Sequence, residues 1–393
     1  MHKSKSKVNH IKILYITRGF PPYRGGSENY IWEVYRRLSK KHRINLITYY
    51  HKDRERIKTI REVKQLKNGS KLSEFLNFFF SSFRKSLFLD FDAIHAVTYP
   101  SGLCALLPRL VSGRPLIVTI HDIGIIEKEV KNVSSFVKGI KWVLQGIVCN
   151  LADAIIVPSE KVRKDIMKYH SISKSKIFIT PYGFDTNVFN VSVKGGIMKN
   201  KWKLKDKRIV LYVGMYSPKK GLEYLIEAVK DVKKQIPDIK LVIAGPAIDT
   251  NYENRVKNLV AEMNLESSVV FTGYFDEKYK SNVYKDADVV VEPSLYGMGY
   301  SFACIEASAL GKPVVATKLL EEIGVVKNNV SGIVVPLRDS KSIAGAIIKL
   351  LENKKFYTYL SKHGLNFVRN FNWDETARLT EDVYKNTYKK LLR

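Results

Sequence analysis

The chain has 393 residues and a formal net charge of +28 at pH 7, with 66 Lys or Arg against 38 Asp or Glu. This length exceeds what one hydrophobic core usually serves, so we expect two domains. A hydrophobic content of 45% is that of a globular protein, and we find neither an apolar run long enough to cross a bilayer nor a convincing signal peptide. The charge indicates a polyanionic partner, such as nucleic acid, an anionic membrane surface or phosphorylated small molecules.

The three cysteines, Cys104, Cys149 and Cys304, lie far apart and form no CxxC pair. This spacing argues against disulfides and zinc, and it favours a reducing, cytoplasmic location.

The first predicted strand, Ile11 to Thr17, leads into a loop with tandem prolines and the pair Gly25-Gly26. A helix is expected from about Ser27. Glycines at a helix N-terminus let backbone N–H groups approach an anion closely, although most such pairs are simply turns.

The next stretch, Lys64 to Asp90, is rich in aromatic and basic residues. Its phenylalanines are Phe75, Phe78, Phe79, Phe80, Phe83 and Phe88. An amphipathic helix of this composition suits the headgroup boundary of an anionic membrane, and the alternative is a core helix of the first domain. We favour membrane contact, because the aromatic density exceeds what one buried face needs.

A strand over Pro115 to Ile120 is followed directly by His121. A lone histidine is more often structural, but the carboxyl end of a strand favours a functional one. The segment from Lys176 to Phe189 then reads as a strand and a turn, and the loosely patterned stretch from Asn190 to Lys207 is the expected interdomain linker.

A second α/β series begins at Arg208 and leads to the stretch around which the sequence is organised, Asp288 to Thr317. It predicts a strand, a glycine loop, a helix N-capped by Ser301 and ended by Gly311, and a further strand. Glu306 is the one charge on that helix. It either binds ligand hydroxyls or caps a neighbouring loop as a structural carboxylate.

This stretch resembles the nucleotide-sugar-binding signature of the retaining glycosyltransferases of family four, a GT-B group. In that family a Glu, a glycine-containing aromatic loop and a second Glu precede a small-residue helix and Gly-x-Pro-Val-Val. Glu306 falls on the second Glu, whose family role is to hold the donor ribose hydroxyls, and Met298 falls on the first.

The resemblance covers nearly the whole chain. The FPP and Gly-Gly stretch is similar to the donor-phosphate loop, and TIHD is similar to TxHD, where the histidine lies by the donor sugar. Lys220-Gly221 matches the Lys-Gly whose lysine neutralises the donor diphosphate, whereas the family arginine falls on Met215. The catalytic residues so implied are His121, Lys220 and Glu306. The donor-binding residues are Gly25, Gly26, Gly214, Lys220, Gly299, Ser301, Phe302 and Glu306.

We therefore expect an α/β GT-B fold with two doubly wound Rossmann-like domains facing a cleft. The first would span 1–190, with a C-terminal helix (375–393) crossing back to it, and the second 191–374. The resemblance implies no metal and no other cofactor.

The expected function is retaining transfer of a sugar from a nucleoside-diphosphate sugar to an acceptor hydroxyl, on a lipid-linked or polysaccharide acceptor at the inner face of the cell membrane. Because Met215 and Met298 replace two family site residues, a catalytically weak nucleotide-sugar-binding subunit is the alternative. A nucleic-acid-binding protein is disfavoured, since no recognisable motif accompanies the charge.

Overall fold

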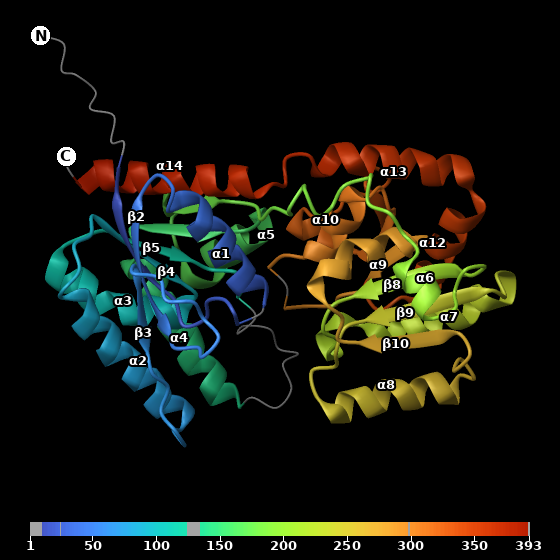
Figure 1. Cartoon of the computed structure of the whole chain (residues 1–393), viewed down its shortest axis with the longest axis horizontal. Helices are drawn as coiled ribbons and strands as arrows, with labels where there is room; N and C mark the ends of the chain where they lie inside the picture. The colour runs from blue at the N-terminus through green and yellow to red at the C-terminus, as the bar shows by residue number, and fades with distance from the viewer. Residues whose placement is uncertain (1–9, 24, 124–133, 298, 392–393) are drawn as a thin grey trace, which may run out of the picture. The chain divides into compact units, whose positions relative to one another are not determined.

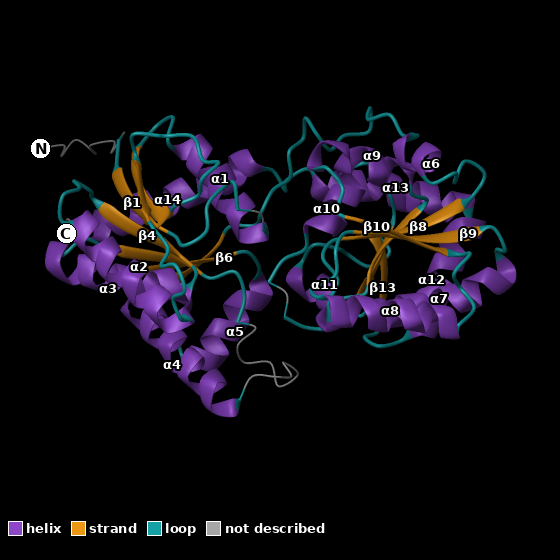
Figure 2. Ribbon diagram, turned by 60° about the horizontal axis from the view of Figure 1, so that its bottom comes forward, coloured by secondary structure: helices purple, strands orange, loops and turns teal. Residues whose placement is uncertain are grey.

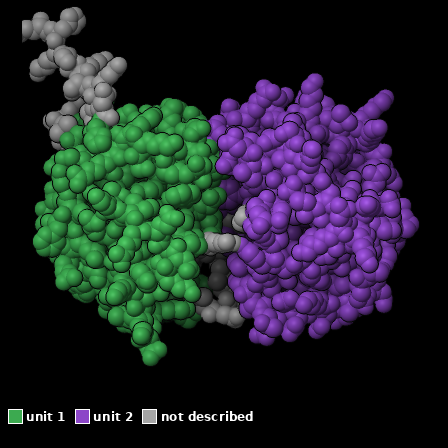
Figure 3. Space-filling view, in the orientation of Figure 1, with its two compact units in different colours: residues 1–183, 373–393 green, residues 184–372 purple. Residues whose placement is uncertain are grey.

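In the computed structural model, the described residues are 10–23, 25–123, 134–297 and 299–391, and they form two compact α/β units. Unit 1 comprises residues 1–183 and 373–393, and unit 2 comprises residues 184–372 (Figure 3). The chain passes between the units twice, at residues 183–184 and at residues 372–373. These two boundaries lie close together, since the Phe184 N–H donates to the Phe371 carbonyl over 3.2 Å.

The expected linker, Asn190 to Lys207, instead belongs to unit 2. The buried carboxylate of Asp286 accepts hydrogen bonds from the backbone N–H groups of Gly196, Met198 (2.7 Å) and Lys199 (3.1 Å). These bonds attach the stretch to the unit, and the division therefore falls after residue 183, earlier than the expected 190.

Unit 1 is built on a sheet of seven parallel strands in the order β3-β2-β1-β4-β5-β6-β7. Its strands are β1 (Lys12–Ile16), β2 (Arg43–Tyr49), β3 (Ile60–Val63), β4 (Ala93–Val97), β5 (Leu116–Thr119), β6 (Ala154–Val157) and β7 (Ile177–Ile179). Its helices are α1 (Gly26–Leu38), α2 (Lys71–Ser86), α3 (Tyr99–Ser112), α4 (Ser135–Leu151), α5 (Glu160–His170), the 3-10 turn η1 (Lys174–Lys176) and α14 (Trp373–Leu391).

Helices cover both faces of this sheet. α1 packs beside α14 on one face, while α2, α3 and α4 lie side by side on the other (Figures 1 and 2). Strands covered on both faces are largely apolar, and the strand residues Leu14, Ile94 and Val118 are fully buried.

A buried chain of polar groups joins α14 to the sheet of unit 1. The Tyr384 hydroxyl lies 2.8 Å from the Tyr15 hydroxyl and 2.7 Å from Nδ1 of His95, whose Nε2 lies 2.7 Å from Oγ1 of Thr119. Burial lowers the pKa of His95 to about 3, so its ring is neutral in the folded protein near pH 7.

Unit 2 is built on six parallel strands in the order β10-β9-β8-β11-β12-β13. Its strands are β8 (Arg208–Val213), β9 (Ile239–Ala244), β10 (Val269–Gly273), β11 (Val289–Glu292), β12 (Val314–Thr317) and β13 (Gly332–Val335). Its helices are α6 (Ile197–Lys201), α7 (Leu222–Gln235), α8 (Thr250–Glu262), α9 (Lys280–Asp286), α10 (Phe302–Ala309), α11 (Lys318–Ile323), α12 (Ser340–Glu352) and α13 (Lys354–Val368), with the 3-10 turns η2 (Pro218–Lys220) and η3 (Glu277–Tyr279).

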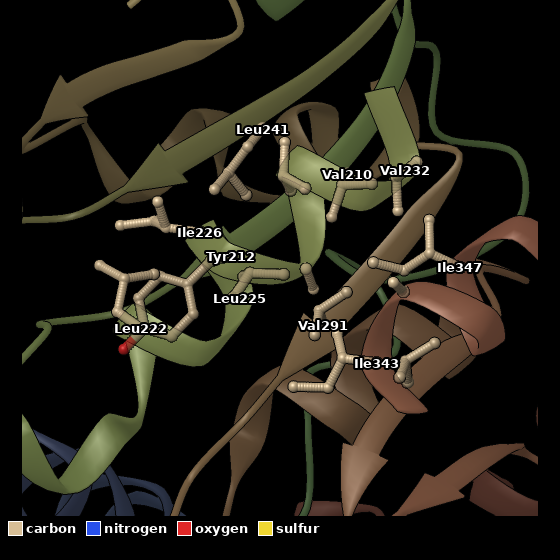
Figure 4. Packing of buried hydrophobic residues seen from close by; sticks show 14 of the residues in the cluster. Val210, Tyr212, Leu222, Leu225, Ile226, Val232, Leu241, Val291, Ile343 and Ile347 are labelled. Carbon is tan, nitrogen blue, oxygen red and sulfur yellow. The ribbon is translucent and has the colours of Figure 1, made fainter. Parts of the chain in front are cut away.

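Alternate residues of these strands enter two separate hydrophobic clusters. Val210 and Val291 belong to the cluster under α7 and α12, which Figure 4 shows, while Val290 and Leu211 belong to the cluster under α10. Packing on both faces fixes the strand ends, and the loops that follow those ends are thereby held in place.

The prediction of two doubly wound α/β halves is confirmed. The strand β3 was not predicted, since its sequence Ile-Arg-Glu-Val is short and half charged. Among the described residues, none of the helices is long and apolar enough to cross a membrane.

Candidate functional site

Each sheet has one position where the strand order reverses direction. In unit 2 this position lies between β8 and β11, which pair in parallel. In open parallel sheets, ligands bind beside the carboxyl ends of the two strands at such a point. The loops after β8 and β11 hold Gly214, Lys220, Gly299 and Ser301, so these predicted residues share the carboxyl edge of the unit 2 sheet, and the region between the two loops is called the crevice.

Two helices begin at this crevice, α7 after Gly221 and α10 after Ser301. Neither N-terminus has a side-chain cap among the described residues, whereas other helices, such as α2 and α8, are capped by Ser70 and Asp249. The Ser301 hydroxyl, predicted to cap α10, lies instead 3.4 Å from Oε2 of Glu292. Neither Gly221 nor Ser301 thus caps its helix with a side chain, and an uncapped helix N-terminus suits an anion.

The two loops are joined by backbone contacts. The Leu295 N–H donates to the Lys219 carbonyl over 2.8 Å, and the Lys219 ammonium reaches the Gly297 carbonyl over 3.5 Å. Gly221, which precedes α7, has a left-handed φ of 64°, a conformation that favours glycine. The backbones of the two loops therefore lie against each other beside the crevice.

Lys220 forms an ion pair beside the crevice. Its Nζ lies 3.2 Å from Oε1 of Glu292, the last residue of β11, and the two side chains are 16% and 2% exposed. Glu292 also accepts a hydrogen bond from the Ser294 hydroxyl. The predicted phosphate cation is thus anchored by a buried carboxylate.

Glu306 lies on α10 and is 5% exposed. Its carboxylate accepts hydrogen bonds from the Lys280 ammonium (2.9 Å) and the Tyr284 hydroxyl (2.8 Å), both from α9. Burial and the Glu306 carboxylate raise the pKa of Tyr284, so that hydroxyl remains protonated and can donate. Both interpretations of Glu306 stay open, because a carboxylate held in this way can also accept from a ligand hydroxyl.

The remaining predicted residues of unit 2 differ in how they can act. Gly214 follows β8 with a φ of 134°, and the Met215 side chain is 52% exposed. Gly299 is buried, while the Phe302 ring packs against the core and lies 5.6 Å from the Tyr300 ring. The Phe302 side chain therefore serves the fold.

In unit 1, Gly25 and Gly26 follow β1 at the other reversal point, between β1 and β4. A Cβ built on Gly25 would lie 2.3 Å from one oxygen of the Glu28 carboxylate, and one on Gly19 would lie 2.3 Å from the other. This carboxylate suits the N-terminus of α1 and repels a phosphate at the same place. The phosphate role predicted for Gly25 and Gly26 is therefore less well supported than that of unit 2.

His121 follows β5, two residues beyond the strand. Its Nδ1 contacts the Tyr182 hydroxyl, and its buried Nε2 has no hydrogen-bond partner among the described residues. Burial lowers the pKa of His121 to about 4, so the ring is neutral at pH 7 and offers one nitrogen to a ligand. His121, Gly25 and Gly26 lie in unit 1, whereas all the other predicted site residues lie in unit 2.

The aromatic cluster of α2 divides between core and surface. Phe78 is fully buried, and Phe75 and Phe79 pack against the core of unit 1, so the core interpretation holds for these three. Phe80 and Phe88 are 60% and 84% exposed.

Sequence reasoning did not assign Lys280, Tyr284 or Tyr182. They lie far along the chain from the residues that they contact, and the sequence carries no signal for those pairings. Met298 and Arg24, which bear on the donor-binding prediction, lie outside the described residues.

Comparison with known proteins agrees with this architecture. HepE of Anabaena, solved in complex with UDP and glucose, superposes with a TM-score of 0.80 at 17% identity, covering 96% of this chain and 100% of that one. Together with the two parallel sheets, this likeness shows the GT-B fold.

Two family models match successive parts of the chain. The model of Glycosyltransferase Family 4 matches residues 24–188, and that of Glycosyl transferases group 1 matches residues 196–367. The chain belongs to the family of GT-B glycosyltransferases that these two models describe, as its sequence predicted.

Two curated relatives are each 29% identical over the aligned part. An uncharacterized glycosyltransferase of Methanocaldococcus jannaschii aligns over 237 residues, 59% of either chain. A phosphatidyl-myo-inositol mannosyltransferase of Mycobacterium leprae aligns over 179 residues, 45% of this chain and 46% of the relative. The chain thus spans about half to three fifths of the length of these two relatives.

Proposed function

We propose that the protein transfers a sugar from a nucleoside-diphosphate sugar to an acceptor hydroxyl, with retention of the anomeric configuration. The observation that carries this proposal is the crevice between β8 and β11, where Lys220 and the N-termini of α7 and α10 meet. Two positive helix ends and an ammonium group suit the diphosphate of a donor. HepE, whose fold is similar, was solved with UDP and glucose.

The chemistry follows from what this crevice offers. Breaking the bond between the sugar and the diphosphate leaves negative charge on the departing phosphate. Fixed N–H dipoles and Lys220 stabilise that charge without reorganising, and electrostatic stabilisation of this kind usually contributes most to the rate enhancement of an enzyme. As in the family that the chain resembles, the acceptor hydroxyl attacks from the face that the diphosphate leaves, and a donor phosphate oxygen takes its proton.

His121 takes a different part in this proposal. Its ring is neutral at pH 7, because burial lowers its pKa to about 4, so it acts as a hydrogen-bonding group for a sugar hydroxyl and not as a cation. The Tyr182 hydroxyl contacts Nδ1 and fixes the ring, and Nε2, which has no partner among the described residues, is the nitrogen we assign to the sugar hydroxyl.

A donor screen tests the proposal. The purified protein is incubated with a panel of nucleoside-diphosphate sugars and a membrane lipid extract, and products are identified by mass spectrometry. We expect one donor to yield a glycosylated product with the anomeric configuration of the donor, as measured by NMR. A product of inverted configuration excludes the retaining mechanism.

We further propose that the acceptor lies at an anionic membrane surface on the cytoplasmic side. Large apolar side chains are exposed along α4, whose sequence contains two lysines and no acidic residue. They include Phe136 (77%), Ile140 (44%), Val143 (49%), Ile147 (41%) and Leu151 (45%). Their spacing of three or four residues places them on one face, and a stripe of this kind with flanking lysines suits a lipid headgroup boundary.

Vesicle co-sedimentation tests the membrane contact. Binding to anionic vesicles, weak binding to neutral ones and diminished binding at high salt are the expected results. Replacing Phe136, Ile140 and Val143 with Ser should remove the salt-resistant part, whereas the same change at the exposed Ile248 and Leu337 of unit 2 should leave it. Equal loss in both variants contradicts a specific role for α4.

The second candidate is a nucleotide-sugar-binding subunit without transfer activity. It is favoured by Met215 at the position of a family arginine, and by the ion pairs that engage Lys220 and Glu306. Binding of a donor without hydrolysis or transfer, across the same panel, identifies this function.

A further inference from the structure

Glu292 is a carboxylate where the sequence pattern favours an apolar residue. It continues the run Val289, Val290 and Val291 at the end of β11 and is 1% exposed. Removing a carboxylate from water costs several kcal/mol, and an apolar side chain of similar size is often as stable or more stable in such a place. The fold of the strand therefore does not by itself account for Glu292.

The contacts of Glu292 all lead to the crevice. Oε1 accepts from the Lys220 ammonium (3.2 Å) and from the Ser294 hydroxyl, and Oε2 lies 3.4 Å from the Ser301 hydroxyl. Lys220 ends η2 next to α7, and Ser301 precedes α10. One buried carboxylate thus joins the loop after β8 to the N-terminus of α10.

We propose that Glu292 is a positioning residue, which holds the Lys220 ammonium and the Ser301 turn in the geometry that binds the donor diphosphate. This inference rests on the proposed function of the crevice. A lysine side chain has four rotatable bonds, so fixing it before the ligand arrives lowers the entropy lost on binding. The carboxylate also accepts from the hydroxyl of Ser301, the residue that directly precedes α10.

The need for such a residue follows from Met215. Where the family places an arginine beside the glycine after β8, this chain has an exposed methionine. A planar guanidinium is pre-organised, whereas an ammonium on a flexible stem is not. Because the arginine is absent, donor binding depends more on Lys220, and the position of its ammonium group matters more.

A double-mutant cycle on nucleoside-diphosphate binding tests this inference without an acceptor. The variants are Lys220→Met, Glu292→Leu and the double substitution, with affinities for UDP, ADP and GDP measured by calorimetry. We expect Lys220→Met to weaken binding of the preferred diphosphate at least tenfold in the native background and less than threefold in the Glu292→Leu background. Glu292→Gln, which keeps one acceptor oxygen, should retain part of the Lys220 effect.

Asp286→Asn is the matched control. Asp286 is also a buried carboxylate of unit 2, and its three described hydrogen bonds go to backbone N–H groups away from the crevice. Its substitution should lower the melting temperature and leave the Lys220 effect unchanged. The Glu292→Leu protein should keep or raise its melting temperature, which separates positioning from folding.

Two results would contradict the inference: one contradicts it alone, and the other contradicts the proposed function as well. If Lys220→Met weakens binding equally, or more strongly, in the Glu292→Leu background, Glu292 does not position Lys220, and the proposed function is unaffected. If the native protein binds none of the three diphosphates, the proposed function fails and this inference fails with it.

Discussion

A Cβ atom built on Gly221 would lie 2.3 Å from the carbonyl oxygen of Pro293. Gly221 precedes α7 and Pro293 follows β11, so the loops after two neighbouring strands touch backbone to backbone. Only glycine permits this approach. The close contact of the two loops in turn brings Lys220 beside Glu292.

Gly221→Ala should therefore separate the two loops. The left-handed φ and the clash with Pro293 together should lower the free energy of unfolding by about 2 to 4 kcal/mol, and donor binding should weaken as well. Urea denaturation and calorimetry measure the two effects. Gly324→Ala is the control, because Gly324 has a φ of 88° with nothing within 4 Å of its Cβ direction, so it should lose stability and keep donor affinity.

Glu306→Gln should weaken binding of the nucleotide sugar about tenfold, since a ligand hydroxyl would then meet a neutral amide instead of a carboxylate. Tyr284→Phe is the matched change, because it removes only the hydroxyl that donates to Glu306 and keeps the hydrogen bond from Lys280. We expect it to lower the melting temperature and leave donor affinity unchanged. The opposite pattern, with stability lost in Glu306→Gln and affinity kept, would identify Glu306 as a structural carboxylate.

Met215→Arg should tighten nucleoside-diphosphate binding by about tenfold. Met215 is 52% exposed beside Gly214, so a longer charged side chain fits without burial, and a charge-assisted contact is worth about 1.5–3 kcal/mol. Leu337→Arg adds the same charge at another exposed site of unit 2 and should change the affinity little. Equal gains in both variants would point to a general charge effect and against the position of Met215.

The stability of unit 1 should fall as the pH drops below 6.5. Because burial lowers the pKa of His95 to about 3, the unfolded chain takes up a proton there at a pH where the folded chain does not. The stabilising contribution is complete above pH 6.5 and decreases toward pH 3, by roughly 2 kcal/mol between pH 6.5 and 4.5. Urea titrations at several pH values should show a shallower pH dependence for His95→Gln, and an unchanged slope would exclude His95 as a contributor.

Much of this architecture could be predicted because it depends on local sequence. The apolar run of β11, the spacing of α10 and the turn at Gly311 are set by neighbours a few residues apart, and Gly311 has the left-handed φ of 72° expected after a helix. The α2 helix shows where such reasoning ends. Periodicity identified an amphipathic helix and could not say that Phe75, Phe78 and Phe79 would meet the core.

The site was predicted less completely, because its pairings connect distant parts of the chain. Lys220 was identified from the sequence, but its contact with Glu292 depends on β8 and β11 being neighbours in the sheet. The same holds for Glu306 with Lys280 and for His121 with Tyr182. Sequence resemblance supplied the roles of individual residues, and the structure supplied their partners.

The placement of α14 also bears on how the protein is made. Unit 2 is formed by residues 184–372, whereas unit 1 lacks α14 until residues 373–391 have been synthesised. Until then Tyr15 and His95 have no Tyr384 to pair with, and the face of the sheet that α14 covers is open to solvent. Domains usually fold in the order in which the ribosome delivers them. In this protein we expect unit 1, most of which is translated before unit 2, to finish folding after it.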